Sequence, residues 1–219
     1  MKANLSPLQQ DAASGLYFQH LLASGQSKGQ LLLLHGVGGN ETNLTAIVER
    51  LPADWDYWFI RGPLPLGAAQ FAWFEVNFTA NGPHPNLEQA EQSRQLLLRF
   101  VDSRLDKTRL KVSAGFSQGG IMSASIALTC PDKLDGFAML SGRILPEIAP
   151  KIADKAALAG LKGFIAHGQH DSKLPIAWAE KATAWLTELG ICHQVKRYNM
   201  DHQLSVEECD DLKHWLTAL

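Results

Sequence analysis

Residues 115–119, Gly-Phe-Ser-Gln-Gly, constrain the fold more than any other segment of the chain. Their G-x-S-x-G spacing follows a short apolar strand predicted over residues 110–114 and precedes a helix of small and apolar residues predicted over 121–130. A serine on such a sharp strand-to-helix turn is held in a strained conformation, with its hydroxyl projecting from the sheet. The same five residues could form an ordinary surface loop elsewhere, but this setting makes Ser117 a candidate nucleophile.

Apolar runs alternate with helical patterns along most of the chain. Strands are predicted over residues 30–34, 56–61, 110–114, 136–140, 163–166 and 193–198, with an edge strand over 15–22, and helices over 42–51, 86–105, 121–130, 176–189 and from 205 onward. This order predicts an α/β protein with an open, mostly parallel, twisted sheet and helices on both faces. We expect one domain, residues 1–219, and the short connection between residues 140 and 163 leaves no room for a large cap domain.

Charge and cysteine content exclude several classes of protein. The formal net charge is -2 and no basic block stands out, so we expect no nucleic-acid partner and no stable membrane insertion. The first residues lack the continuous apolar segment of a signal peptide, which favours a soluble cytoplasmic protein. The three cysteines, Cys130, Cys192 and Cys209, are widely spaced, so we expect reduced thiols in or near the core.

A glycine-rich loop, residues 35–40, follows the predicted strand 30–34. It lacks both common phosphate-binding spacings, which argues against a nucleotide site. It could be a tight strand-to-helix turn, or an oxyanion loop that directs the N–H of Val37 toward a substrate oxygen. The N–H of Gln118, at the start of the helix after Ser117, would be the second donor.

A serine nucleophile needs an imidazole base and a carboxylate that orients it, and in this kind of sheet both follow the serine in the chain. Asp171 and His202 lie at the ends of later predicted strands and satisfy that order. Asp201 is an alternative acid, although adjacent side chains rarely adopt the required geometry. The remaining histidines that compete with His202 lack its position: His20, His35, His84, His193 and His214. His167, His170 and Asp171 lack a matching distant cluster, so we expect no metal.

Two further segments carry patterns. Residues 66–85 are predicted to be irregular, and their aromatic residues could form a flap, a wall of a substrate pocket or a homodimer contact: Phe71, Trp73, Phe74 and Phe78. Ser205 and Glu208 predict a capping box at the start of the last helix. The residues expected to face inward from that helix are Val206, Cys209, Leu212, Leu216 and Leu219.

Taken together, the motifs resemble the carboxylesterase/phospholipase family of small α/β-hydrolases, which includes acyl-protein thioesterases and bacterial carboxylesterases. The matching stretches are residues 34–41, 61–63, 72–75, 115–120, 140–142, 167–175 and 202–205. The resemblance implies the α/β-hydrolase fold, with Ser117, Asp171 and His202 as the triad and Val37 and Gln118 as oxyanion donors. It also implies that Trp73 forms part of the wall of the acyl pocket, and we expect Phe74 and Gly36 to bind the substrate with it. One departure is Asp201, because the family usually has glycine before the catalytic histidine.

The function that follows is a metal-independent, cofactor-free serine hydrolase for a small-molecule or acyl-chain carboxylic ester or thioester. Ser117 would attack the acyl carbonyl with His202 as base, and the resulting acyl-enzyme would be released by water. The alternative is a hydrolase fold retained as a binding or signalling module with negligible turnover, which fold alone does not exclude. The departure at Asp201 is the sequence feature that supports this alternative.

Overall fold

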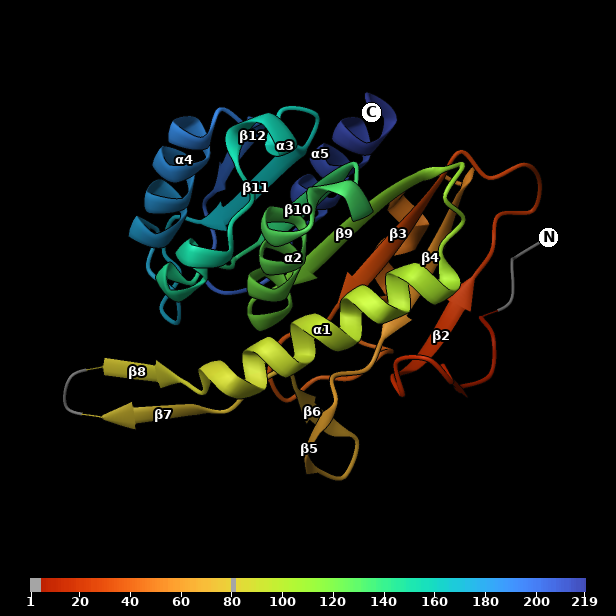
Figure 1. The fold of residues 1–219 in the computed structure, drawn as a ribbon, viewed down its shortest axis with the longest axis horizontal. Helices are drawn as coiled ribbons and strands as arrows, with labels where there is room; N and C mark the ends of the chain where they lie inside the picture. The colour runs from red at the N-terminus through yellow and green to blue at the C-terminus, as the bar shows by residue number, and fades with distance from the viewer. Residues whose placement is uncertain (1–4, 80–81) are drawn as a thin grey trace.

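The computed structural model describes residues 5–79 and 82–219, apart from the side chains of residues 78, 79, 82 and 83. The expectation for the Phe78 side chain therefore lies outside the described part. An eight-stranded sheet runs through the centre, with the strand order β1-β2-β4-β3-β9-β10-β11-β12 (Figure 1). Its strands are β1 Gln9–Gln10, β2 Tyr17–Leu21, β3 Gly29–Leu34, β4 Trp55–Ile60, β9 Leu110–Phe116, β10 Gly136–Leu140, β11 Lys162–Gly168 and β12 Cys192–Tyr198.

Parallel pairing dominates the sheet, as predicted. All neighbours from β4 to β12 pair in parallel, whereas β2 pairs antiparallel with β4 and with β1. The central strands β3 and β10 are buried along their whole length, which explains their continuous apolar sequence. The prediction that residues 15–22 form an edge strand is wrong in one respect, because the two-residue β1 covers the outer side of β2.

Helices cover both faces of this sheet (Figure 1). One face packs against α1 Leu87–Arg104, α2 Gln118–Thr129, α3 Lys155–Leu158 and α4 Ala177–Leu189, and the other against α5 Val206–Thr217 and the 3-10 helix η1 Thr45–Arg50. Two further 3-10 turns are η2 Pro131–Lys133 and η3 Pro146–Lys151. Alternate residues of β3 enter the two cores, with Leu32 and Leu34 on the α1 side and Leu31 and Leu33 on the α5 side.

The helix predicted over residues 42–51 is wrong, because only the short η1 forms. The Asn40 side chain accepts hydrogen bonds from the backbone and hydroxyl of Thr42, and the Thr45 hydroxyl donates to the Thr42 carbonyl. Such local bonds compete with the regular helical pattern. The segment therefore begins as a turn and becomes helical only from Thr45.

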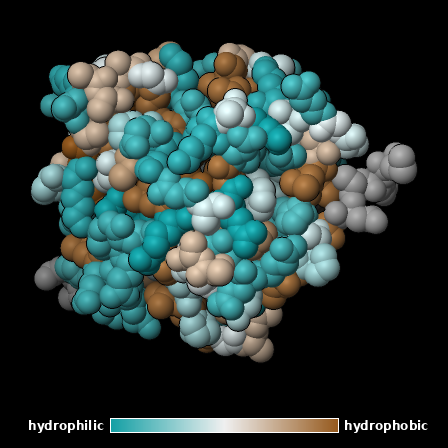
Figure 2. All heavy atoms as spheres, turned by 45° about the vertical axis from the view of Figure 1, so that its right-hand side comes forward, coloured by the Kyte–Doolittle hydropathy of each residue, from teal (hydrophilic) through white to brown (hydrophobic). Residues whose placement is uncertain are grey.

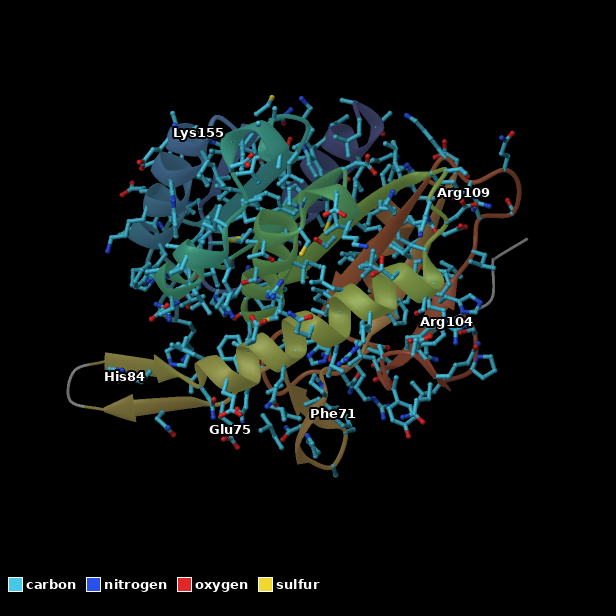
Figure 3. The ribbon with its side chains drawn as sticks, in the orientation of Figure 1. Phe71, Glu75, His84, Arg104, Arg109 and Lys155 are labelled. Carbon is cyan, nitrogen blue, oxygen red and sulfur yellow. The ribbon has the colours of Figure 1, made fainter. Side chains whose placement is uncertain are left out.

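The irregular structure predicted for residues 66–85 is also wrong, because the segment forms two hairpins. β5 Leu64–Gly67 pairs with β6 Gln70–Ala72, and β7 Val76–Thr79 pairs with β8 Gly82–Pro85. In Figure 3, Phe71 marks the first hairpin below α1, Glu75 lies just before β7, and His84 marks the second hairpin to the left of the start of α1. The second hairpin projects from the body beside the start of α1 (Figure 1).

Caps and burial test the remaining expectations. Asn86 caps α1 through the N–H of Gln89, and both bonds of the Ser205–Glu208 capping box are present. Val206 does not face inward as predicted but is 57% exposed, and Trp215 takes the buried place on α5. The three thiols are free, but Cys192 is exposed and lies outside the core.

The outer surface is mostly hydrophilic where Figure 2 shows it, with hydrophobic side chains in small scattered groups. Along the described chain, no helix has both the length and the apolar character needed to cross a bilayer.

Candidate active site

Ser117 occupies the sharp turn between β9 and α2, with φ 54 and ψ -117. A residue with a Cβ rarely adopts this conformation, and tight packing of the turn maintains it. A Cβ on Gly115 would collide with the backbone of Gly119, and one on Gly119 would collide with that of Leu34. The N–H of Ser117 donates to the Leu140 carbonyl at 2.8 Å, which joins the turn to β10. The serine hydroxyl therefore lies at the carboxyl edge of the sheet, beside the positive end of α2.

The structure brings Ser117, His202 and Asp171 together in one chain of hydrogen bonds. His202 Nε2 lies 2.9 Å from Ser117 Oγ, and His202 Nδ1 lies 2.7 Å from Asp171 Oδ2. Because a carboxylate only accepts, Nδ1–H donates to Asp171 and leaves the Nε2 lone pair facing the serine hydroxyl. The Phe116 ring packs against the imidazole with centroids 4.8 Å apart. This tautomer can take a proton from Ser117.

The Asp171 carboxylate is buried and fully supported. Its Oδ1 accepts from the backbone N–H groups of Lys173 and Leu174, at 2.9 and 2.7 Å. His167 Nε2 donates to the Leu174 carbonyl at 2.7 Å and lies 3.4 Å from Asp171 Oδ2, and burial lowers the pKa of His167. These contacts fix the carboxylate that orients His202.

Asp201 does not take the place of the acid. Its carboxylate accepts from the backbone N–H groups of Ser172 and His202, each at 2.7 Å, and from the Ser172 hydroxyl at 3.2 Å. Its φ is not among the positive values found in the described residues, so the position does not require glycine. The backbone therefore tolerates aspartate where the family usually has glycine, and the Asp201 side chain links the His202 loop to the Asp171 loop.

The glycine-rich loop lies against the nucleophile. A Cβ on Gly36 would come within 3.3 Å of the Ser117 Cβ, so this glycine passes directly beside the serine. His35 stabilises the loop through two hydrogen bonds. Its Nδ1–H donates to the Gly36 carbonyl, and its Nε2 accepts from the Gly62 N–H. Both bonds suit a neutral ring, and burial lowers the pKa of His35 accordingly. Val37, at the tip, is 56% exposed.

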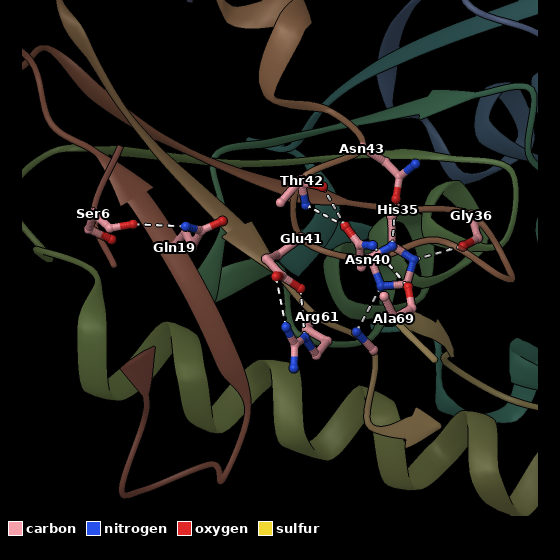
Figure 4. A network of polar contacts seen from close by, with 11 residues as sticks. Ser6, Gln19, His35, Gly36, Asn40, Glu41, Thr42, Asn43, Arg61 and Ala69 are labelled. Carbon is pink, nitrogen blue, oxygen red and sulfur yellow. Dashed lines mark hydrogen bonds and ion pairs between the residues drawn. The ribbon is translucent and has the colours of Figure 1, made fainter. Parts of the chain in front are cut away.

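Pairing with the first hairpin fixes the far end of this loop. The Gly38 N–H donates to the Phe71 carbonyl and the Phe71 N–H donates to the Gly39 carbonyl, each at 2.8 Å. Arg61 forms a two-pronged ion pair with Glu41, at 2.6 and 2.8 Å (Figure 4). Its guanidinium also lies over the Phe71 ring, 4.5 Å from the centroid. The loop is therefore preorganised by contacts on both sides.

Trp73 and Phe74 are fully buried and do not form an exposed wall. The Trp73 indole N–H donates to the His35 carbonyl at 2.8 Å. The Gln118 side chain accepts from the Trp73 backbone N–H and donates to the Phe74 carbonyl. These contacts link the start of α2 to the segment before β7. No sequence pattern marks the supporting roles of His35 and the Gln118 amide, because their partners are distant in the chain. The partners of His167 lie within seven residues of it, but their contact depends on how the Asp171 loop folds.

The comparisons with known proteins agree with this architecture. A family profile described as Phospholipase/Carboxylesterase matches residues 22–219. The putative hydrolase MhqD of Bacillus subtilis (strain 168) is 26% identical over 202 residues, which cover 90% of this chain and 96% of that protein. Acyl-protein thioesterase 1 of Kluyveromyces lactis is 27% identical over 210 residues, which cover 87% and 92%.

Solved structures share the fold across nearly the whole chain. The carboxylesterase from Mesorhizobium loti gives a TM-score of 0.81 at 21% identity, covering 97% of this chain and 99% of that one. The Bacillus cereus carboxylesterase gives 0.80 at 24% identity, covering 93% and 94%. The family match extends over most of the sequence, and the fold agrees with it. The chain is accordingly a hydrolase of the phospholipase/carboxylesterase family, with the α/β-hydrolase fold.

Proposed function

We propose that the protein hydrolyses carboxylic esters or thioesters through an acyl-enzyme formed on Ser117. The observation that carries the proposal is the pair of hydrogen bonds from Ser117 Oγ through His202 to Asp171, at 2.9 and 2.7 Å. A serine hydroxyl is a weak nucleophile at neutral pH, and an imidazole in this geometry removes its proton as the bond to carbon forms. The negative charge of Asp171 stabilises the imidazolium that results.

The proposed reaction has two symmetrical halves. Ser117 Oγ attacks the acyl carbon while its proton passes to His202 Nε2, and the same nitrogen then protonates the departing alcohol or thiol. Water next gives a proton to His202 and attacks the acyl-enzyme, and Ser117 recovers its proton when the carboxylic acid leaves. No redox partner or cofactor enters this scheme.

We assign the oxyanion to the backbone N–H groups of Val37 and Gln118. Gln118 begins α2, so its N–H has no acceptor within the helix, and the helix dipole favours negative charge there. Within the described residues, neither N–H is bonded to a backbone carbonyl. The absence of a side chain at Gly36 would let the acyl group approach Ser117 closely. Donors fixed before the reaction cost little reorganisation in the transition state.

In this proposal Trp73 and Phe74 influence the substrate without touching it directly. Both side chains lie in the core, so they would act through the groups they hold, namely the His35 carbonyl and the Gln118 amide. Substitution of Trp73 should then disturb the oxyanion donors before it changes chain-length preference.

The proposal is tested with p-nitrophenyl esters from acetate to palmitate and with an acyl thioester, using wild type and Ser117→Ala. We expect the variant to remain folded and to lose roughly 10⁴-fold or more in kcat. Labelling by a fluorophosphonate probe should disappear with the hydroxyl. Hydrolysis that persists in Ser117→Ala would refute the assignment, and a folded wild type that neither turns over nor labels would favour the non-catalytic binding module.

A further inference from the structure

Arg143 is a partly buried cation, and no carboxylate among the described residues forms an ion pair with it. Burial lowers the pKa of its guanidinium, opposed only by the charge of Glu147, and no hydrogen bond to a described residue contributes. Other arginines with partly or fully buried side chains are paired, among them Arg94 with Glu91 at 2.7 Å, Arg61 with Glu41 at 2.6 Å and Arg104 with Asp11 at 2.6 Å. Withdrawing a charge from water is costly unless a partner compensates it. The five N–H donors of Arg143 are thus available to a ligand.

An aromatic ring keeps this guanidinium in place. Its central carbon lies over the Trp178 ring, 4.6 Å from the centroid, and the Lys181 ammonium lies 4.5 Å from the same centroid. The ring attracts positive charge but gives the N–H groups no oxygen to bind. Two cations on one ring also make the local potential positive. The arrangement therefore fixes the position of the Arg143 guanidinium but provides no hydrogen-bond acceptor for its N–H groups.

Arg143 directly follows a segment that is hydrogen-bonded to the proposed nucleophile. β10 ends at Leu140, whose carbonyl accepts from the Ser117 N–H, and three residues span at most about 11 Å. A Cβ on Gly142 would lie 3.2 Å from the Gly120 Cα in the first turn of α2. Trp178 belongs to the first turn of α4, which follows the Asp171 loop. The Arg143–Trp178 pair thus bridges the two segments that flank the site.

We propose that Arg143 binds an anionic group, a carboxylate or a phosphate, carried by the substrate away from the scissile bond. This inference rests on the proposed ester or thioester hydrolysis and adds the substrate class. The planar guanidinium fork matches both oxyanions. Among the described residues, Glu147 is the carboxylate whose charge opposes the lowered pKa of Arg143.

A matched pair of esters tests the proposal. The mono-p-nitrophenyl ester of adipic acid ends in a carboxylate, whereas p-nitrophenyl hexanoate has the same chain length and ends in a methyl group. We expect Arg143→Gln to lower kcat/KM for the adipate ester roughly 10- to 100-fold and to leave the hexanoate within about threefold. The control is Arg99→Gln, which removes an exposed arginine of α1 and should change neither value.

Inhibition distinguishes the two anions. Free adipate and inorganic phosphate are tested as inhibitors of hexanoate hydrolysis, and the stronger one names the preferred group. In Arg143→Gln the better inhibitor should weaken at least tenfold, and Trp178→Leu should weaken it partially because the guanidinium loses its support. Equal losses on both esters in Arg143→Gln, or unchanged inhibition, would overturn the proposal and leave Arg143 as a packing residue.

Binding measured without turnover separates this inference from the proposed function. Calorimetric titration of adipate and phosphate into Ser117→Ala and into the Ser117→Ala/Arg143→Gln double variant needs no hydrolysis. Binding to the first and at least tenfold weaker binding to the second would support the anion site even if esters proved not to be substrates. Binding of neither anion to Ser117→Ala would overturn it even if hydrolysis follows the proposed mechanism.

Discussion

Asp201 is an exposed residue that joins two loops of the candidate site through backbone hydrogen bonds. Its Oδ1 accepts from the N–H groups of Ser172 and His202, so one carboxylate holds the two loops that carry Asp171 and His202. These hydrogen bonds lower the pKa of Asp201, the bond from the Ser172 backbone most strongly. The carboxylate therefore stays ionised throughout the range in which the enzyme would work.

At this scale we predict that Asp201→Ala lowers kcat/KM for p-nitrophenyl esters by roughly 5- to 20-fold, mostly in kcat. The loss follows because His202 would sample orientations in which Nε2 no longer faces Ser117. Asp201→Asn keeps an oxygen for both N–H groups, so its loss should be clearly smaller. Equal losses in the two variants would instead indicate that the charge of Asp201 matters and that its hydrogen bonds do not.

The sequence predicts the strands that carry the candidate site residues, but it does not predict the hairpin that packs against the glycine-rich loop. Continuous apolar runs ending in glycine or polar residues predict β3, β9 and β11, and the candidate residues lie at their carboxyl ends because parallel strands share one edge. The sequence does not predict the β5–β6 hairpin, although its two strands are neighbours in the chain, because Pro65 and Gly67 interrupt the alternating pattern of β5 and the pairing contains an irregularity between them. The contacts of β6 with Gly38 and Gly39 are long-range, and local patterns carry no information about them.

The capping box of α5 contains an unusual carboxyl group. Glu208 is buried, its Oε1 has no partner among the described residues, and burial raises its pKa to about 8. In the unfolded chain this group ionises near pH 4.5, so between that value and about pH 8 the folded state retains a proton that the unfolded state has lost. The contribution of Glu208 to stability is thus present below pH 4.5 and is lost as the pH rises through about 8.

We therefore predict that Glu208→Gln, which keeps the cap acceptor but cannot ionise, is more stable than wild type at pH 8 by roughly 2–4 kcal/mol. The two proteins should approach each other in stability near pH 5. Urea unfolding at intervals from pH 5 to 8 measures the difference. Glu207→Gln, an exposed change in the same helical turn, serves as the control and should keep the wild-type slope. A Glu208→Gln slope equal to that of wild type would contradict the prediction.

For the whole molecule, the central sheet is shared by two apolar layers, and this predicts how the chain unfolds. Leu32 packs toward α1 and α2, and its neighbour Leu33 packs toward α5, both buried. If residues 1–219 form one domain, neither layer can come apart without exposing the strands that the other needs. Loss of either layer should then release the whole fold.

Leu32→Ala and Leu33→Ala probe the two layers from adjacent positions on β3. Each should lower the free energy of unfolding by about 2–5 kcal/mol, because each removes a side chain that is buried on one face of the same strand. Tryptophan fluorescence reports on both layers, since Trp73 lies in one and Trp55 in the other, and far-ultraviolet circular dichroism reports on the whole backbone. Both probes should give a single coincident urea transition that moves to lower concentration in either variant. Two separate transitions, each sensitive to only one substitution, would show instead that the layers unfold independently and that the chain is not a single cooperative domain.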